Sequence, residues 1–215
     1  DLEPSVPYEI IIGNDMSTDN TRIIGQYFTN IIVYNNNNMY NFLMNCNEMA
    51  KFSKGKYILF LNNDTKVHKE WLIYLIKLIE SDEKIGMVGS KLIYPNGKLQ
   101  EAGGIVWNNG DCYNYGRGNN SDMPEYNYVK EVDYISGISI LIKKCVWEKI
   151  GGFDKRYISA YYEDKDFAFE IRKLGYKVMY QPKSVVEHNE GISNSKILSS
   201  SIKKYQIRNK KKFIK

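Results

Sequence analysis

Short apolar runs alternate with helical segments between residues 8 and 79, and this order limits the possible folds more than any other feature of the sequence. Strand-like runs occur at residues 8–13, 31–34 and 57–61, and residues 41–52 and 71–79 carry apolar side chains at helical spacing. Uninterrupted apolar runs suit buried strands, whereas helical spacing suits helices that cover a sheet. The order therefore predicts an α/β fold with a parallel sheet flanked by helices.

The second half of the sequence is less regular, and residues 96–128 are rich in Gly, Asn and Tyr, which we interpret as loops with short strands. Further strands are expected at residues 87–94, 136–142, 178–180 and 185–188, and helices at residues 163–174 and 195–215. No internal repeat or long linker divides the chain. We therefore expect one domain over residues 1–194, followed by a basic helical tail over residues 195–215.

The composition favours a globular protein in a reducing compartment. Of the 215 residues, 43% are hydrophobic, and the three cysteines form no CxxC pair, which fits the cytoplasm better than a disulfide scaffold. No apolar run approaches the ~20 residues that cross a bilayer. The net charge of +5 lies largely in the tail, so a nucleic-acid partner is not indicated. The tail either contacts the inner face of the membrane or remains a solvated helix.

Two acidic clusters follow apolar runs at distant points of the sequence: Asn62-Asn63-Asp64 and Glu163-Asp164. Oxygen ligands at the end of a buried strand suit a divalent cation and a diphosphate, and a carboxylate pair at a helix start suits a general base. Each cluster also has a purely structural explanation, as an Asx turn or as acidic residues at a helix N-terminus. Together they provide what transfer from a nucleotide-diphosphate donor requires.

Seven stretches of the sequence match a known family in the family's own order. They lie at residues 8–21, 57–67, 85–104, 134–144, 151–154, 161–176 and 182–191. On these stretches the chain resembles family 2 glycosyltransferases of the GT-A fold, close to the rhamnosyltransferase-like branch. The resemblance implies an α/β fold with a Rossmann-like mixed sheet flanked by helices.

The sequence departs from the family at its start. The family begins with a strand followed by Pro-Val-Tyr-Asn, which helps hold the nucleobase, and this sequence begins just after that point. We therefore expect the domain over residues 1–194 to be incomplete at its N-terminus, or another segment to replace the first strand. Donor affinity is expected to depend on that element.

The resemblance implies a donor site that begins with Asp15, whose position binds the base in the family. A carboxylate accepts a hydrogen bond from the imide N–H of uracil or thymine, although Asp15 could equally cap a turn. Asn62, Asn63 and Asp64 occupy the place of the DxD motif. Asp64 would bind Mg²⁺ or Mn²⁺, while Asn62 would contact ribose or metal-bound water.

Three further positions complete the donor side of the implied site. Ser136 and Gly137 lie where the family places residues near the donor sugar and acceptor, and a glycine permits close backbone approach. His188 ends an apolar run and would contact the metal or the diphosphate; imidazole is a fair ligand for Mn²⁺ and a poor one for Mg²⁺. His68 has no matching role and is expected at the surface.

Glu163 and Asp164 match the family's Glu-Asp motif, which implies the catalytic roles. Asp164 would act as general base, taking the proton of the acceptor hydroxyl as that oxygen attacks the anomeric carbon and inverts it. Glu163 would orient this base or bind the acceptor. Asp166 is expected to be a helix cap or a solvated residue. Trp107 and the tyrosines between residues 113 and 128 could stack on sugars or simply pack the loops.

The sequence thus predicts an inverting, metal-dependent glycosyltransferase that moves a sugar from a UDP- or dTDP-sugar to a polysaccharide or lipid-linked glycan. Two alternatives stay open. The chain could be a degenerate sugar-nucleotide-binding module, or a metal-dependent phosphotransferase or nuclease using the same acidic cluster. The absence of a G-x-x-x-x-G-K-[ST] loop argues against a P-loop enzyme.

Overall fold

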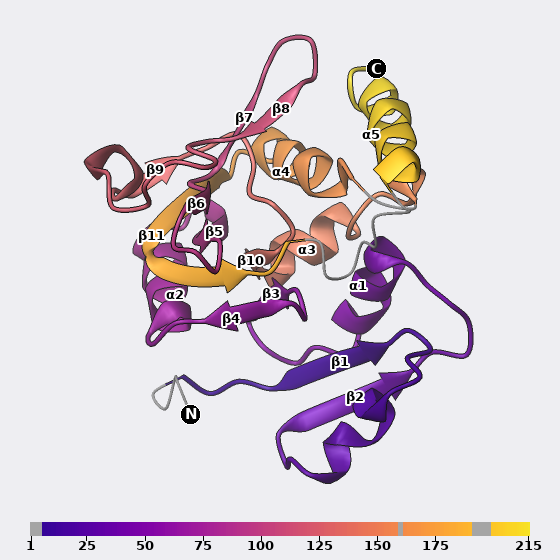
Figure 1. Cartoon of the computed structure of the whole chain (residues 1–215). Helices are drawn as coiled ribbons and strands as arrows, with labels where there is room; N and C mark the ends of the chain where they lie inside the picture. Colours follow the sequence, from indigo (N-terminus) through magenta and orange to yellow (C-terminus); the bar gives the residue numbers. More distant parts are fainter. Residues whose placement is uncertain (1–5, 159–160, 191–198) are drawn as a thin grey trace.

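The computed structural model describes residues 6–158, 161–190 and 199–215, with the backbone alone at residues 199–203 (Figure 1). At its centre lies a seven-stranded mixed sheet in the order β3-β10-β5-β11-β4, with β6 paired to β5 and β9 to β11. The mixed sheet implied by the resemblance is confirmed. Its strands are β3 (Tyr57–Leu61), β4 (Thr65–Val67), β5 (Ile85–Ile93), β6 (Leu99–Glu101), β9 (Lys130–Glu131), β10 (Ser139–Lys143) and β11 (Lys177–His188).

Strand β10 is inserted between two strands that precede it by many residues. It runs antiparallel to both β3 and β5, whereas β11 runs parallel to β5. The segment before β10 packs directly on β5, since a Cβ added to Gly89 would lie 2.0 Å from the Ile135 side chain. This close approach fixes the chain that leads from Ile135 into β10.

Strands β1 (Ile10–Asn14) and β2 (Ile31–Asn35) form a separate parallel pair, linked by the 3-10 helix η1 (Asn20–Gln26). The parallel order predicted for the first half is right for this pair. It is wrong for β3, which pairs with β10 and not with β1. Among the described residues, no other strand pairs with the remaining edge of β1 or of β3.

The helices cover both faces of the central sheet (Figure 1). Side chains alternate along the strands, so Met87 and Ile140 enter a core with α1, α3 and α4, while Val88 and Leu141 enter a second core with α2. Both cores are made of fully buried aliphatic and aromatic residues. The helices are α1 (Phe42–Ala50), α2 (Trp71–Ser81), α3 (Lys144–Ile150) and α4 (Glu163–Lys173).

The region predicted as loops contains β6, the 3-10 helix η2 (Pro124–Tyr126) and a hairpin of β7 (Gly104–Val106) and β8 (Cys112–Asn114). A third 3-10 helix, η3 (Lys155–Tyr157), precedes α4. The two short strands expected at residues 178–180 and 185–188 are one strand, β11, whose register with β5 shifts between Gln181 and Val185. The four residues between those runs therefore form a bulge without leaving the strand.

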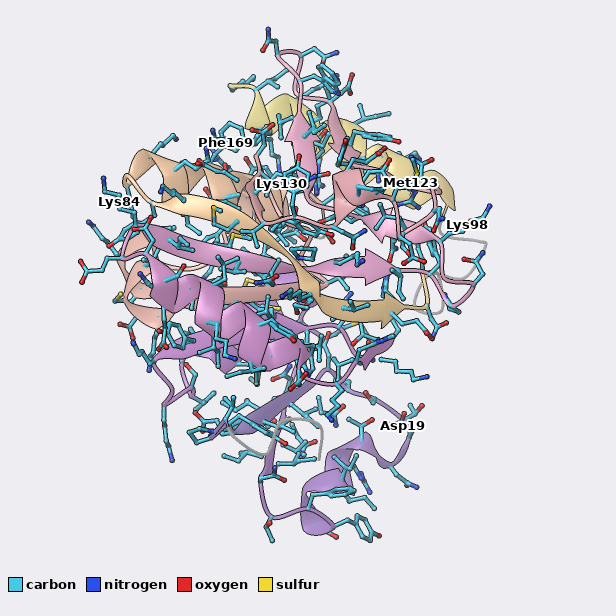
Figure 2. All side chains as sticks on the ribbon, turned by 90° about the vertical axis from the view of Figure 1, so that its left-hand side faces the viewer. Asp19, Lys84, Lys98, Met123, Lys130 and Phe169 are labelled. Carbon is cyan, nitrogen blue, oxygen red and sulfur yellow. The ribbon has the colours of Figure 1, made fainter. Side chains whose placement is uncertain are left out.

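The basic tail forms helix α5 (Ser199–Phe213), which packs on the rest of the fold. Asn209 is fully buried and donates to the backbone carbonyls of Tyr157 and Tyr161. Phe213 packs edge-on against Phe169, which is labelled in Figure 2. None of the described helices is both long enough and apolar enough to cross a bilayer.

Candidate functional site

The three residues before β10 each connect to a different part of the candidate site. The Ser136 amide donates to Glu101 Oε1 at 3.0 Å, and the Gly137 amide donates to Asp164 Oδ2 at 3.1 Å. The Ile138 carbonyl accepts from the Asn62 amide at 3.0 Å. Ser136–Ile138 therefore links β6, the start of α4 and the turn after β3.

The structure brings the two predicted metal ligands together at the ends of two strands. Asp64 follows β3, His188 ends β11, and the Asn189 amide donates to the Asp64 carbonyl at 3.0 Å. His188 Nε2 lies 3.2 Å from Asp64 Oδ1, and the two side chains are 8% and 10% exposed. One imidazole nitrogen and one carboxylate oxygen thus face each other in a nearly dry site.

This pair fits a divalent metal. Two ligands in adjacent positions, each about 2.1 Å from one ion, lie about 3 Å apart, close to the observed separation. Over the described parts of the chain, no third His, Cys, Asp or Glu joins them in a cluster. A diphosphate and water would have to supply the remaining ligands, which Mg²⁺ and Mn²⁺ accept readily.

The other DxD-like residues lie on the same turn. Asn62 is half-buried and its carbonyl accepts from the Thr65 hydroxyl at 2.6 Å, whereas Asn63 is exposed. The opposite ring nitrogen of His188, Nδ1, lies 3.1 Å from Gln100 Oε1. The sequence did not single out Gln100, because it lies in the stretch interpreted as loops.

Glu163 and Asp164 begin helix α4 after a strained turn. The preceding residues Tyr161 and Tyr162 have φ of 74° and 78°, a left-handed conformation that is costly for side chains with a Cβ. Both Asp164 oxygens accept from the buried Lys165 ammonium, at 3.0 and 3.1 Å. Burial alone would lower the pKa of Lys165, but the charge of Asp164, the neighbouring Tyr134 and the hydrogen bond to Asp164 together outweigh burial and raise the pKa. Asp164 therefore stands in a buried ion pair beside the Gly137 amide.

Two buried glutamates flank this ion pair. Burial raises the pKa of Glu101 to about 7. Burial and, after it, the Asp164 charge raise the pKa of Glu163 to about 8. One oxygen of each, Oε2, has no hydrogen-bond partner among the described residues. Near neutral pH, Glu163 is therefore largely a neutral carboxyl group next to Asp164.

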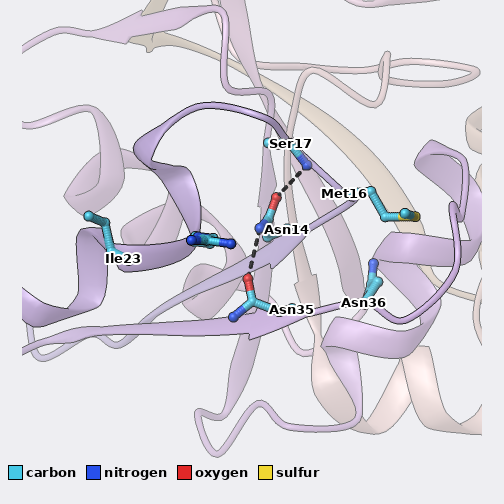
Figure 3. A pocket seen from close by; sticks show the side chains of 7 residues that line it. Asn14, Met16, Ser17, Ile23, Asn35 and Asn36 are labelled. Atoms are coloured by element: carbon cyan, nitrogen blue, oxygen red, sulfur yellow. Dashed lines mark hydrogen bonds between the residues drawn. The ribbon is translucent and has the colours of Figure 1, made fainter.

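Asp15 lies apart from these residues, at the end of β1. Its Oδ1 accepts from the Tyr40 amide and, at 3.4 Å, from the Asn36 side chain. Beside it opens a surface pocket of about 640 Å³ (Figure 3). Figure 3 also shows Asn14 accepting from the Ser17 amide and donating to Asn35. The pocket lining is rich in amides, with Asn14, Met16, Ser17, Arg22, Ile23, Asn35 and Asn36.

One expectation from the sequence needs correction. Asp166 is neither a cap nor solvated: it is buried, and its Oδ1 accepts from Arg156 at 2.6 Å and from the Tyr157 hydroxyl at 2.9 Å. His68 is exposed, as expected. Lys165 lies between Asp164 and Asp166 in the sequence, and this charge pattern is the one signal there of the ion pair with Asp164.

The aromatic residues of the loop region divide into two groups. Trp107, Tyr113 and Tyr128 are 59%, 48% and 54% exposed, whereas Tyr126 is buried. The buried ring packs edge-on against Tyr115. Loop packing therefore accounts for part of the group, and the exposed rings are available to a ligand.

Sequence comparison finds relatives over most of the chain. Residues 4–148 match the model of a family described as "Glycosyl transferase family 2". O-antigen biosynthesis protein RfbC of Myxococcus xanthus is 27% identical over 158 residues, which make up 68% of this chain and 12% of RfbC. N-acetylglucosaminyl-diphospho-decaprenol L-rhamnosyltransferase of Mycobacterium tuberculosis is 31% identical over 67 residues, 31% of this chain and 22% of that protein. The chain thus spans less than a quarter of the length of either relative.

Solved structures share the fold at low sequence identity. GalNAc-T7, solved with UDP, GalNAc and Mn²⁺, superposes with a TM-score of 0.69 at 15% identity, over 84% of this chain and 37% of that one. The mannosyltransferase PcManGT of Pyrobaculum calidifontis, solved with GDP-Man and Mn²⁺, superposes with a TM-score of 0.59 at 14% identity, over 84% of this chain and 47% of that one. The predicted GT-A fold is confirmed.

The raised pKa of Glu101 predicts a pH dependence of stability. The folded protein holds the proton up to about pH 7, whereas the unfolded chain loses it near 4.5. Because the folded state binds more protons between these values, the free energy of unfolding falls as the pH rises through this range. Glu101→Gln removes this contribution. Between about pH 5 and 8, the free energy of unfolding measured in urea should therefore fall by up to about 3 kcal/mol more in the wild type than in the variant. Equal losses would contradict the prediction; the exposed Glu125→Gln is the control.

Proposed function

The chain belongs to glycosyl transferase family 2, and on that premise we propose that it is an inverting, metal-dependent glycosyltransferase. Its proposed donor is a UDP- or dTDP-sugar, and its acceptor a hydroxyl of a polysaccharide or lipid-linked glycan. The observation that carries the proposal is the pair of Asp64 and His188. Each lies at the end of a strand, and Asp64 Oδ1 is 3.2 Å from His188 Nε2. A nearly dry carboxylate–imidazole pair at the end of a sheet is a site for a metal and a diphosphate.

Asp64 and His188 would hold the ion, and the imidazole favours Mn²⁺ over Mg²⁺. The metal, when bound, neutralises charge on the leaving diphosphate. Asn62 and Asn63, on the same turn, are proposed to contact the ribose or metal-bound water. Mn²⁺ accompanies the sugar nucleotide or nucleotide in the two structural neighbours described above, which supports the choice of ion.

Asp164 is proposed to take the proton of the acceptor hydroxyl. As that proton leaves, the hydroxyl oxygen forms a bond to the anomeric carbon, the carbon–oxygen bond to the diphosphate breaks, and its electron pair stays on the diphosphate. Attack from the opposite face inverts the anomeric carbon. The Lys165 ammonium and Gly137 amide hold the carboxylate in place, at 3.0 to 3.1 Å. The neutral Glu163 would orient the acceptor.

The nucleobase of the donor is proposed to bind at the end of β1. Asp15 is proposed to accept from an imide N–H, which selects uracil or thymine, and the neighbouring amide-rich pocket provides further hydrogen-bonding groups. Ser136 and Gly137, whose amides bond to Glu101 and Asp164, are proposed to contact the donor sugar. GalNAc-T7 contains UDP and PcManGT contains GDP-Man, so the neighbours are compatible with more than one nucleotide.

The acceptor is inferred from the relatives and from the charge of α5. The mycobacterial relative is named for a lipid-linked diphospho-sugar, and RfbC for O-antigen biosynthesis. Lys204 and Lys211 of α5 are exposed, and so is Lys215, two residues beyond its end. We propose that this helix contacts an anionic membrane surface at its cytoplasmic face, where such acceptors would be presented.

The donor site predicts metal-dependent nucleotide binding. UDP or dTDP should bind this chain tightly only with Mn²⁺. Asp64→Ala or His188→Ala removes one of the two proposed protein ligands and should weaken binding by more than the roughly 10- to 100-fold that loss of a ligand's hydrogen-bond partner costs. Calorimetry with UDP, dTDP, GDP and ADP measures this, and His68→Ala, an exposed histidine, is the matched control. Unchanged Mn²⁺-dependent binding by both variants would show that the metal lies elsewhere.

The base assignment predicts a separate effect on turnover. Asp164→Asn should lower kcat roughly 10²- to 10⁴-fold while nucleotide binding stays within about twofold, because general base catalysis acts only on the chemical step. Transfer to a lipid-linked N-acetylglucosaminyl diphosphate is the assay. Asp166→Asn, in the same helix but bound to Arg156, is the control. Wild-type transfer by Asp164→Asn would remove Asp164 from the role, and nucleotide binding without any transfer by the wild type would favour a non-catalytic binding module.

A further inference from the structure

Strand β6 lies between the two halves of the site and contacts both. It comprises only Leu99, Gln100 and Glu101 and pairs with the C-terminal end of β5. All three residues are at most 2% exposed. Successive side chains of a strand point in opposite directions. Gln100 accordingly lies against His188, on the metal side, and Glu101 against the Ser136 amide, on the side of Asp164.

The contact with Gln100 determines which nitrogen of the His188 ring carries the proton. When Nδ1–H donates to Gln100 Oε1, across 3.1 Å, Nε2 has no proton and directs its lone pair toward Asp64, 3.2 Å away. A cation is then the partner that both groups can share. The reverse orientation of the amide would place the proton on Nε2, and a metal would have to displace it. The Gln100 amide therefore decides between a ring ready to bind a metal and one that is not.

Glu101 acts on the other half through the backbone. Glu101 accepts a hydrogen bond from the Ser136 amide, and the next amide, that of Gly137, donates to Asp164. A shift of Ser136 would carry Gly137 with it and disturb the carboxylate. A buried acid with one oxygen lacking a partner among the described residues adds nothing to core packing that an apolar residue would not, so its use lies in this contact.

The chain after β6, at Gly104, also packs against the segment that leads to Ser136. The Gly104 amide donates to the Tyr134 carbonyl at 2.9 Å, and a Cβ at Gly104 would lie 2.1 Å from the Tyr134 ring. The same ring lies 4.4 Å from the Lys165 ammonium, which pairs with Asp164. The chain leaving β6 is thus packed against Tyr134, two residues before Ser136.

We propose that β6 is the positioning element of this site: Gln100 holds His188 ready for the metal, and Glu101 holds Ser136 and Gly137 against Asp164. Two adjacent residues then fix the metal side and the base side relative to each other. The inference rests on the function proposed above. It assigns no chemistry to either residue, because each acts through a neighbour.

The test separates the two effects. Mn²⁺ affinity in the presence of UDP is measured by electron paramagnetic resonance, and kcat is measured at saturating Mn²⁺. Gln100→Leu should weaken Mn²⁺ roughly 10- to 100-fold with little change in kcat, and Gln100→Glu, which still accepts from Nδ1–H, should restore the affinity. Glu101→Asp, too short to reach the Ser136 amide, should lower kcat about 10-fold or more with Mn²⁺ affinity unchanged, whereas Glu101→Gln keeps the acceptor and most of the turnover.

Leu99→Ala is the control for packing in the same strand, and thermal unfolding of every variant is measured in parallel. If kcat and Mn²⁺ affinity fall together in all variants in proportion to lost stability, β6 is only a packing strand and the inference is wrong. Wild-type Mn²⁺ affinity in Gln100→Leu, or wild-type kcat in Glu101→Asp, would also overturn it. Failure of the wild type itself to bind Mn²⁺ and UDP would instead contradict the proposed function.

Discussion

The site depends on the insertion of β10 between β3 and β5. This pairing places Ser136–Ile138 just before β10, beside the ends of β3 and β5. There the successive backbone groups bond to Glu101, to Asp164 and to the turn that holds Asp64. Backbone groups buried here must find partners. The partners are Asp164, the proposed base, Glu101, the proposed positioning residue, and Asn62 on the turn that carries Asp64. The same hydrogen bonds therefore complete the fold and align the two halves of the site.

Buried charge is the main cost of this arrangement. Lys165 and Asp164 form a buried pair, and the pKa values of Glu101 and Glu163 are raised because burial disfavours their charged forms. The left-handed Tyr161 and Tyr162 add backbone strain of order 1–3 kcal/mol each. The two apolar cores on either side of the sheet offset these costs. Perturbed pKa values and backbone strain cluster at functional sites, so their occurrence beside one ion pair supports the proposed role of Asp164.

Local patterns predicted the elements well and their pairing poorly. The strand at Tyr57–Leu61 follows from its apolar run, and the proposal of Asp64 and His188 as metal ligands comes from turn chemistry and the family resemblance. The insertion of β10 could not be predicted from alternation, because it joins residues about eighty positions apart. Gln100 and Glu101 were missed since a three-residue strand has too few positions to show a period. The single strand β11 was divided in two because its bulge interrupts the apolar run.

The central claim is that Asp64 and His188 form the metal site of a sugar-nucleotide enzyme. Anomalous X-ray diffraction from crystals grown with UDP and Mn²⁺ tests it most directly, because it locates the ion without reference to activity. The account predicts a manganese peak within coordination distance of both Asp64 Oδ1 and His188 Nε2, with the UDP diphosphate on its open side. Bound UDP with manganese elsewhere, or with none beside this pair, would contradict it.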